Sequence, residues 1–268
     1  MLRRIPVHLI LIVATFCSLA PFLWMALTSV KIYGEALSPN LIPHTFTLKN
    51  YTEIIGRANF LIAFRNSVVV AVPATTMVVF TSTAIGYAFA KYRFPGKEII
   101  FTIILSTMMI PFTAVVIPLF ITMKDLGLID SLMGIIVTSL CSTFGIFLLR
   151  QSIEGVPNDY IDAARVDGAG EFWILFRVIM PLVKPAMATL AVLTFLGNWD
   201  SFMWPSILIK SMDNNTLPML LASMRSLFFE RYTIWSAGSM LTVFPVMILF
   251  IFTSRYFVKG LALTGLKG

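Results

Sequence analysis

The sequence is poor in charged residues. Asp, Glu, Lys and Arg make up only 12% of its 268 residues, against about 25% in soluble globular domains. Apolar residues reach 58%, and the mean hydropathy is +0.88. A soluble core of this length has no place for so much apolar surface. The composition therefore excludes an ordinary soluble domain and indicates that lipid surrounds most of the chain.

Cysteine and histidine are also scarce. Cys17 and Cys141 both fall inside apolar runs, which favours small core residues over a disulfide or a metal site. His8 and His44 have no partner at ligand spacing. The sequence therefore predicts no metal centre.

Motifs that bind nucleotides or carry catalysis are missing too. No G-x-x-x-x-G-K-[ST] loop is present to cradle phosphates, and no strand–glycine–helix unit indicates a dinucleotide site. No Ser/His/Asp set or carboxylate pair lies at one membrane depth. The net charge of +7 is spread over short loops between apolar runs, which is typical of membrane orientation rather than nucleic-acid binding. We expect no catalytic residue, no cofactor bound by this chain and no nucleic-acid partner.

Six stretches are long and apolar enough to cross a bilayer as helices, which takes about 20 residues. Five of them contain no Asp, Glu, Lys or Arg, and one is interrupted by Asp200 alone. They are Ile5–Val30, Asn66–Ala90, Ile99–Met123, Ser131–Leu149, Pro185–Ile209 and Tyr232–Ser254. The first is too long for a signal peptide and lacks a small-residue cleavage site. We predict an all-α membrane protein with six transmembrane helices, forming a single domain over residues 1–268.

Lys and Arg residues divide unequally between the two sides of this arrangement. With the N-terminus inside, twelve lie on the inner side and eight on the outer side. The net charge is then +6 inside and +1 outside. The positive-inside rule therefore favours both termini in the cytoplasm.

The inner loop between the fourth and fifth stretches, residues 150–184, is longer than a simple connection requires. Within it, Asp159–Asp167 is expected to form a short helix, with Pro157 and Asn158 at the capping position and acids near its positive end. Gly168-Ala169-Gly170 then ends that helix, since glycine adopts the backbone angles that stop or turn it.

A second helical stretch follows in the same loop. The helical spacing places four apolar residues on one face, which we expect to lie against the ends of the membrane helices. These are Phe172, Leu175, Phe176 and Ile179. The short charged helix before them is then presented to water. Two interpretations stay open for it: it docks on a soluble partner, or it anchors the bundle at the membrane interface.

The same loop carries a resemblance to a known family. Asp162-Ala163-Ala164-Arg165-Val166-Asp167-Gly168-Ala169, continuing to Ile179-Met180-Pro181, resembles the E-A-A loop of binding-protein-dependent ABC importer permeases. That pattern reads roughly E-A-A-x-x-D-G-A, so Asp162 replaces its glutamate, and Met180 stands where leucine is frequent. In that family the loop forms a coupling helix that docks on the ATPase subunit. The resemblance implies these ATPase-docking residues: Asp162, Ala163, Ala164, Arg165, Asp167, Gly168 and Ala169.

Further motifs resemble the carbohydrate-importer branch of this family. They include Tyr87–Lys97, Met109-Ile110-Pro111, Asn198–Pro205 and Thr216-Leu217-Pro218. Together they resemble the shorter permease of maltose-type importers. The resemblance implies a type I (MetI-like) architecture in a bacterial or archaeal plasma membrane. It also implies the translocation of a sugar or related carbohydrate by alternating access.

The resemblance names partners as well. It implies a second permease subunit in a heterodimer, a dimer of ATPase subunits that bind ATP and magnesium, and an extracytoplasmic sugar-binding protein. It also makes the C-terminal tail a second contact with the ATPase: Gly265, Leu266, Lys267 and Gly268.

Asp200 is an acidic residue inside an apolar stretch. An acid within the membrane is costly unless it faces a cavity or a partner, so Asp200 is a functional candidate. A proton-coupled carrier would need several such acids, and a single one argues against that class. Two interpretations stay open: Asn198, Trp199, Asp200 and Trp204 line a sugar pathway, or the tryptophans form an interfacial belt with Asp200 among the lipid headgroups.

Overall fold

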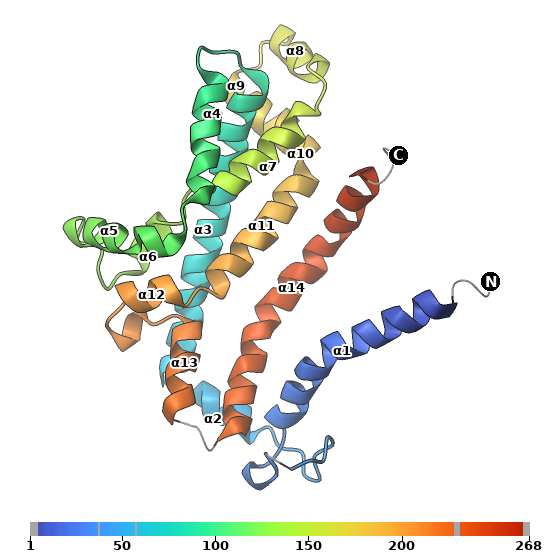
Figure 1. The fold of residues 1–268 in the computed structure, drawn as a ribbon, viewed down its shortest axis with the longest axis vertical. Coiled ribbons are helices and arrows are strands. Elements are labelled where there is room, and N and C mark those ends of the chain that lie inside the picture. Colours follow the sequence, from blue (N-terminus) through green and yellow to red (C-terminus); the bar gives the residue numbers. More distant parts are fainter. Residues whose placement is uncertain (1–4, 37, 57, 228–230, 265–268) are drawn as a thin grey trace. The chain divides into compact units, whose positions relative to one another are not determined.

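The computed structural model describes residues 5–36, 38–56, 58–227 and 231–264, and every regular element in these ranges is a helix (Figure 1). The chain forms two compact units. One combines residues 1–63 with 217–247, and the other combines residues 64–216 with 248–268. The all-helical fold expected from the sequence is confirmed for the described residues.

The first unit is built around the end of a long apolar helix. Its elements are α1 (Ile5–Ser29), η2 (Tyr33–Glu35), α2 (Lys49–Gly56), α13 (Leu217–Leu227) and the first part of α14 (Tyr232–Thr264). The Asn50 amide donates to the backbone oxygens of Ser29 and Lys31, both at 2.8 Å. Arg231 pairs with Glu53 at 2.6 Å. These bonds attach α2 to the residues that end α1 and begin α14.

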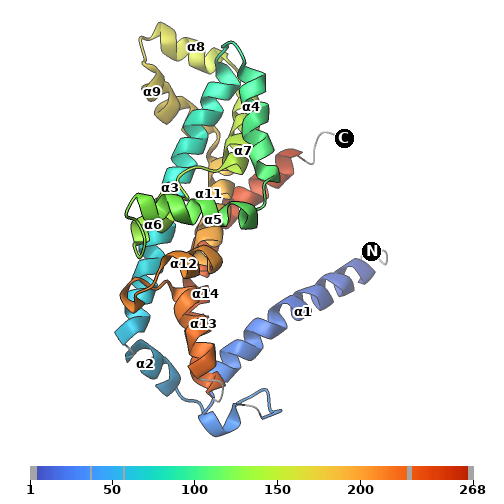
Figure 2. The same cartoon turned by 60° about the vertical axis from the view of Figure 1, so that its left-hand side comes forward.

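The second unit holds most of the polar chemistry. It contains most of α3 (Ala58–Lys91), then α4 (Lys97–Ser106), η3 (Thr107–Met109), α5 (Phe112–Asp125), α6 (Leu132–Val137), α7 (Thr143–Glu154), α8 (Asp159–Val166) and α9 (Glu171–Ile174). It continues with η4 (Leu175–Ile179), α10 (Met180–Leu182), α11 (Lys184–Trp199), α12 (Met203–Leu208) and η5 (Met212–Asn214). Within this unit α8 and α9 lie near the end of α3 at Lys91, whereas α5, α6 and α12 gather farther along that helix (Figures 1 and 2).

Small residues allow α3 and α7 to approach closely. A Cβ atom built on Gly86 would lie 2.9 Å from the backbone nitrogen of Arg150. One turn away, Gly145 lies directly against the Ser82 side chain. The small-residue spacing in α3 therefore serves helix packing, as it often does in membranes.

Three of the described helices pass a length and hydropathy test for crossing a membrane: Val7–Ser29, Asn59–Lys91 and Tyr232–Thr253. Two bent pairs pass together, which raises the number to five if each pair is one span. The pair Lys97–Met109 and Phe112–Asp125 bends by 100°, and the pair Glu171–Leu182 and Lys184–Leu208 bends by 85°.

Three predicted stretches are broken. Ile99–Met123 breaks at Ile110–Pro111, because Pro111 lacks the N–H that would continue the helix. Ser131–Leu149 is two helices separated by residues 138–142, and Pro185–Ile209 is two helices separated by residues 200–202. The prediction of six transmembrane helices therefore stays a prediction, while an all-helical arrangement with long apolar helices is observed.

Two expectations for the 150–184 loop are confirmed only in part. Asn158 occupies the N-cap position of α8 as expected, but its side-chain oxygen makes no capping bond and accepts a hydrogen bond from Lys91 instead. The apolar face is also incomplete: Leu175 and Ile179 are buried, but Phe172 is 75% and Phe176 49% exposed. The buried side consists instead of Ile174, Leu175 and Ile179, because the π-helical turn at η4 departs from the 3.6-residue spacing on which the expected face rests.

A compact connection joins the residues after α12 to the rest of the second unit. Asp130 adopts a left-handed φ of 55°, which aspartate tolerates better than most residues. Its carboxylate accepts the backbone N–H groups of Lys210 and Ser211, both at 2.9 Å. The Asn66 amide of α3 donates to the backbone oxygens of Asp213 at 2.7 Å and Asn215 at 3.0 Å. The 209–216 segment is therefore held by two side chains.

Candidate functional site

The predicted coupling helix is observed as α8, and side chains of α3 hold the loop that carries it. Lys91, the last residue of α3, donates to the backbone oxygen of Val156 at 2.5 Å and to the Asn158 side chain at 2.9 Å. Gly168 ends the segment after α8 with a φ of 80°, which glycine adopts without steric cost. The local expectation for this helix and its stop is thus confirmed.

Glu171 joins the other end of α8 to α3. One of its carboxylate oxygens accepts the hydroxyl of Tyr87 at 2.8 Å, and the other accepts the Nε of Arg165 at 3.0 Å. Arg165 also lies 3.6 Å from Asp162, one turn earlier in α8. A single carboxylate therefore connects α8 to the long apolar helix α3.

The electrostatics of this cluster favour the charged form of Arg165. Its hydrogen bond to Glu171 raises the pKa of the guanidinium above the ordinary value. Burial, reinforced by Glu171, raises the pKa of the Tyr92 hydroxyl above its ordinary value. Tyr92 also lies under the guanidinium, 6.0 Å from ring centre to Cζ. At neutral pH the cluster consequently holds a cation, a carboxylate and neutral tyrosines.

The predicted docking residues fall into two groups. Ile161 and Ala164 point into a core that includes Leu149 and Ile174, so Ala164 positions the helix rather than presenting a surface. Ala169 is partly buried. The others are exposed: Asp162, Ala163, Arg165, Asp167 and Gly168.

Sequence reasoning missed the apolar residues around this exposed face. Val166 is 86% exposed, Phe172 75%, Tyr160 55% and Trp173 53%. Large apolar side chains that gather at an exposed surface often mark an interaction site. The spacing of Tyr160, Ala163 and Val166 at every third position was the available signal, since such residues share one helix face.

Another charged group lies at the start of the loop. The Arg150 guanidinium contacts Glu98 at 2.9 Å and Glu154 at 2.8 Å, and it stacks over the Phe101 ring at 3.9 Å. Arg150 is only 8% exposed. It therefore fixes α7 to α4 where the chain enters the loop.

The residues around Asp200 are only partly brought together. Trp199 is 2% exposed and packs on Phe195 and Phe64, with ring centres 5.5 and 5.7 Å away. Asn198 and Trp204 line one cavity of about 830 Å³, which Trp199 and Asp200 do not line. The structure thus assigns Trp199 to the core and leaves Asp200 exposed beside the cavity.

This cavity, termed the hydroxyl cavity, has a mixed lining. Its polar residues are Thr107, Thr138, Ser139, Thr143, Asn198 and Ser201. Aromatic rings of Phe112, Phe202 and Trp204 form further parts of the wall. A smaller cavity of about 360 Å³ shares Thr138, Ser139 and Asn198 with it and also touches Cys141. A mixture of rings and hydroxyls suits a ligand with both apolar and polar surface.

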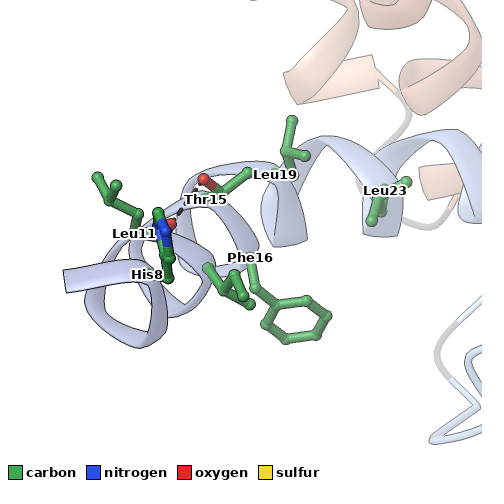
Figure 3. A pocket seen from close by; sticks show the side chains of 7 residues that line it. His8, Leu11, Thr15, Phe16, Leu19 and Leu23 are labelled. Atoms are coloured by element: carbon green, nitrogen blue, oxygen red, sulfur yellow. Dashed lines mark hydrogen bonds between the residues drawn. The ribbon is translucent and has the colours of Figure 1, made fainter. Parts of the chain in front are cut away.

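A different cavity, of about 460 Å³, lies along α1 (Figure 3). Its wall comes from one helix alone and includes His8, Thr15 and Phe16. Most of the apolar side chains of α1 are more than half exposed, including Leu9, Ile12 and Phe16. This surface is therefore an uncovered helix face rather than an enclosed site.

Two expectations concern absent or undescribed features. Within the described ranges no group of three His, Cys, Asp or Glu residues is arranged to hold a metal ion. The predicted tail contact, Gly265–Gly268, lies outside the described residues.

Comparisons with known proteins agree on one family. Residues 82–262 match the model described as "Binding-protein-dependent transport system inner membrane component". The chain is 36% identical to the arabinooligosaccharides transport system permease protein AraQ of Bacillus subtilis (strain 168), over 99% of this chain and 96% of AraQ. It is 30% identical to the lactose transport system permease protein LacG of Rhizobium radiobacter, over 97% of this chain and 96% of LacG.

Solved structures show the same fold. A chain from a bacterial ABC transporter involved in the import of the acidic polysaccharide alginate is 26% identical, with a TM-score of 0.84 and 96% of both chains covered. A chain from the alginate transporter in complex with its pentasaccharide-bound periplasmic protein has a TM-score of 0.65 at 14% identity, over 94% of both chains. At that identity the second likeness concerns the fold alone.

Proposed function

Because the chain belongs to the family of inner-membrane components of binding-protein-dependent transport systems, we propose that it is the shorter permease subunit of a carbohydrate ABC importer. The resemblance inferred from the sequence is thereby confirmed at the level of the family. The named relatives transport arabinooligosaccharides and lactose, which supports a sugar as cargo. The chain translocates that cargo and performs no chemistry on it.

The observation that carries the mechanism is the attachment of α8. The helix exposes Asp162, Ala163 and Val166, while Glu171 and Lys91 fasten its two ends to α3. A rigid attachment of this kind transmits force, because a displaced α8 has to move α3 with it. We therefore place the ATPase contact on this exposed face, with ATP and magnesium bound by the partner and the Gly265–Gly268 tail as a second contact.

The remaining partners follow from the family. We propose a heterodimer with a second permease and transient contact with an extracytoplasmic sugar-binding protein. The family's description as binding-protein-dependent supports the second of these. We also propose that residues 1–268 form one permease domain with six crossings and both termini cytoplasmic, in a bacterial or archaeal inner membrane. In this arrangement residues 150–184 lie in the cytoplasm.

Cysteine crosslinking tests the docking assignment. Cys17 and Cys141 are both exposed and free, so a variant with serine at both positions gives a clean background. Ala163→Cys in that background should crosslink to the ATPase in the assembled importer, in a yield that changes with ATP. Thr122→Cys, exposed on α5, is the matched control and should not crosslink. Equal yields at both positions would refute the assignment.

Reporter fusions test the orientation. A fusion after residue 155, before α8, should be active only with a cytoplasmic reporter. A fusion after residue 213 should be active only with an extracytoplasmic one. Activity on the opposite side at residue 155 would remove the ATPase assignment altogether.

A further inference from the structure

Three breaks in the helices meet at the hydroxyl cavity. Thr107 lies just before the break at Ile110–Pro111, and Thr138 and Ser139 lie in the break between α6 and α7. Ser201 and Phe202 lie in the break between α11 and α12. Lipid cannot satisfy free backbone N–H and C=O groups, so broken helices at membrane depth are tolerated where they line a cavity or are covered by protein. The meeting of three helix breaks at one cavity indicates that the cavity holds water or a polar ligand.

Several polar side chains in the lining are left without a protein partner. Thr107 and Thr143 bond to each other at 3.1 Å, whereas neither Ser139 nor Ser201 makes a side-chain hydrogen bond with any described residue. Asn198 uses one amide N–H on the Thr194 oxygen at 2.9 Å and keeps its other N–H and its carbonyl oxygen. The free groups include both donors and acceptors, which sugar hydroxyls require.

Trp204 forms a buried aromatic part of the cavity wall. It is only 6% exposed, packs edge-on to Phe112 at 6.1 Å, and its indole N–H has no hydrogen-bond partner in the described structure. Buried polar groups are nearly always bonded, so this orphaned donor is an exception. This N–H is itself shielded from contact, so Trp204 contributes its ring to the cavity wall rather than a hydrogen bond to the contents.

The absence of charged side chains from the lining bears on the charge of the ligand that the cavity can hold. None of the residues that line the hydroxyl cavity is Asp, Glu, Lys or Arg. A carboxylate in such a space would lack the cation that normally pairs with it. The neighbouring ionisable residue, Asp200, would repel it when ionised.

From these observations we infer that the hydroxyl cavity is a subsite for a sugar unit without charge, carried by this chain itself. The inference rests on the proposed function and adds a place and a charge preference to it. A volume of about 830 Å³ lies within the range of roughly 300–1,000 Å³ for small-molecule sites. Ser139, Asn198 and Ser201 bond the hydroxyl groups, and the aromatic wall covers the apolar faces of the ring.

Cys141 provides a direct probe of occupancy, because it touches the adjoining cavity and is free. The experiment uses the complete importer in proteoliposomes, with this chain carrying Cys17→Ser. N-ethylmaleimide labelling of Cys141 is measured with neutral arabino-oligosaccharides, with lactose and with acidic alginate oligosaccharides. A neutral sugar that stimulates ATP hydrolysis should slow the labelling at least threefold, and the acidic sugar should not. In the converse variant, Cys141→Ser, the rate at which Cys17 is labelled should be the same with and without each sugar.

A set of variants makes the result independent of Cys141 reactivity. Ser139→Ala, Asn198→Ala and Ser201→Ala combined should lower uptake of the neutral sugar about tenfold. The amount of ATPase that co-purifies with the permease pair, which reports assembly, should equal that of the parent. Thr122→Val, whose hydroxyl bonds only its own helix, should leave uptake intact.

The outcomes separate two failures. If none of the sugars stimulates ATP hydrolysis, the proposed function fails and the subsite fails with it. If a sugar stimulates hydrolysis but the triple variant matches Thr122→Val in uptake, the subsite is refuted and the proposed function stands. Equal protection of Cys141 by neutral and acidic sugars would refute the charge preference.

Discussion

Val166 offers the sharpest test of the docking surface. In the isolated chain its side chain is 86% exposed, so shortening it costs the fold little. If the ATPase covers it, Val166→Ala removes about two methyl groups from the interface. At about 0.8 kcal/mol for each group buried, the loss is about 1.6 kcal/mol, or about 15-fold in affinity.

The assay is titration of the ATPase subunit against the purified permease pair in detergent. Val72→Ala is the matched control, because Val72 is also an exposed valine, at 49%, but lies on α3 within an apolar stretch. The thermal midpoint of both variants should equal that of the parent, which separates docking from folding. Equal affinity of the two variants for the ATPase would refute the placement of the interface on α8.

Three further predictions follow from contacts in the second unit. Gly86→Ala should destabilise the chain by about 1–3 kcal/mol, measured by thermal unfolding, because the added Cβ would lie 2.9 Å from the Arg150 backbone nitrogen; an unchanged midpoint would contradict the close packing. Asp130 has a pKa lowered by the backbone N–H groups of Ser211 and Lys210, so its stabilising effect is complete above the unfolded pKa and is lost as the pH falls through the folded pKa. Asp130→Asn should therefore weaken stability at neutral pH and flatten the decline in acid, whereas an unaltered pH profile of the midpoint would count against this. Glu171→Gln and Tyr87→Phe should each lower ATP-coupled uptake while basal ATP hydrolysis persists. The double variant should lose no more uptake than Glu171→Gln alone, because the two residues share one hydrogen bond. Additive losses of uptake would show that the two residues act separately.

The parts of the docking loop governed by local chemistry were predictable. Gly168 stops α8 through its left-handed backbone, and both the short helix and its end could be read from neighbouring residues. The Tyr87–Glu171 bond joins residues 84 positions apart, and no local rule pairs them. Asn158 illustrates the same limit: its capping propensity was overridden by Lys91, which reaches it from another helix.

The helix breaks were predictable only in part. Pro111 gives a local reason for the sharp bend between α4 and α5. The break between α6 and α7 contains neither glycine nor proline. Its polar residues carry only hydroxyl groups, so composition alone predicts one continuous helix through it. The hydroxyl cavity depends on how these breaks meet, so the sequence indicated Asn198 and Trp204 but not the serine and threonine residues around them.

The continuity of α3 has a mechanical consequence. Lys91 and Tyr87 hold the 150–184 loop near one end of this helix, and Asn66 holds the 209–216 segment near the other. At 1.5 Å per residue, about 38 Å of helix separates Asn66 from Lys91. If α3 tilts as one body by about 5°, one end travels roughly 3 Å relative to the other. If the ATPase displaces α8 as proposed, the displacement reaches the far end of α3 without any signal passing from side chain to side chain.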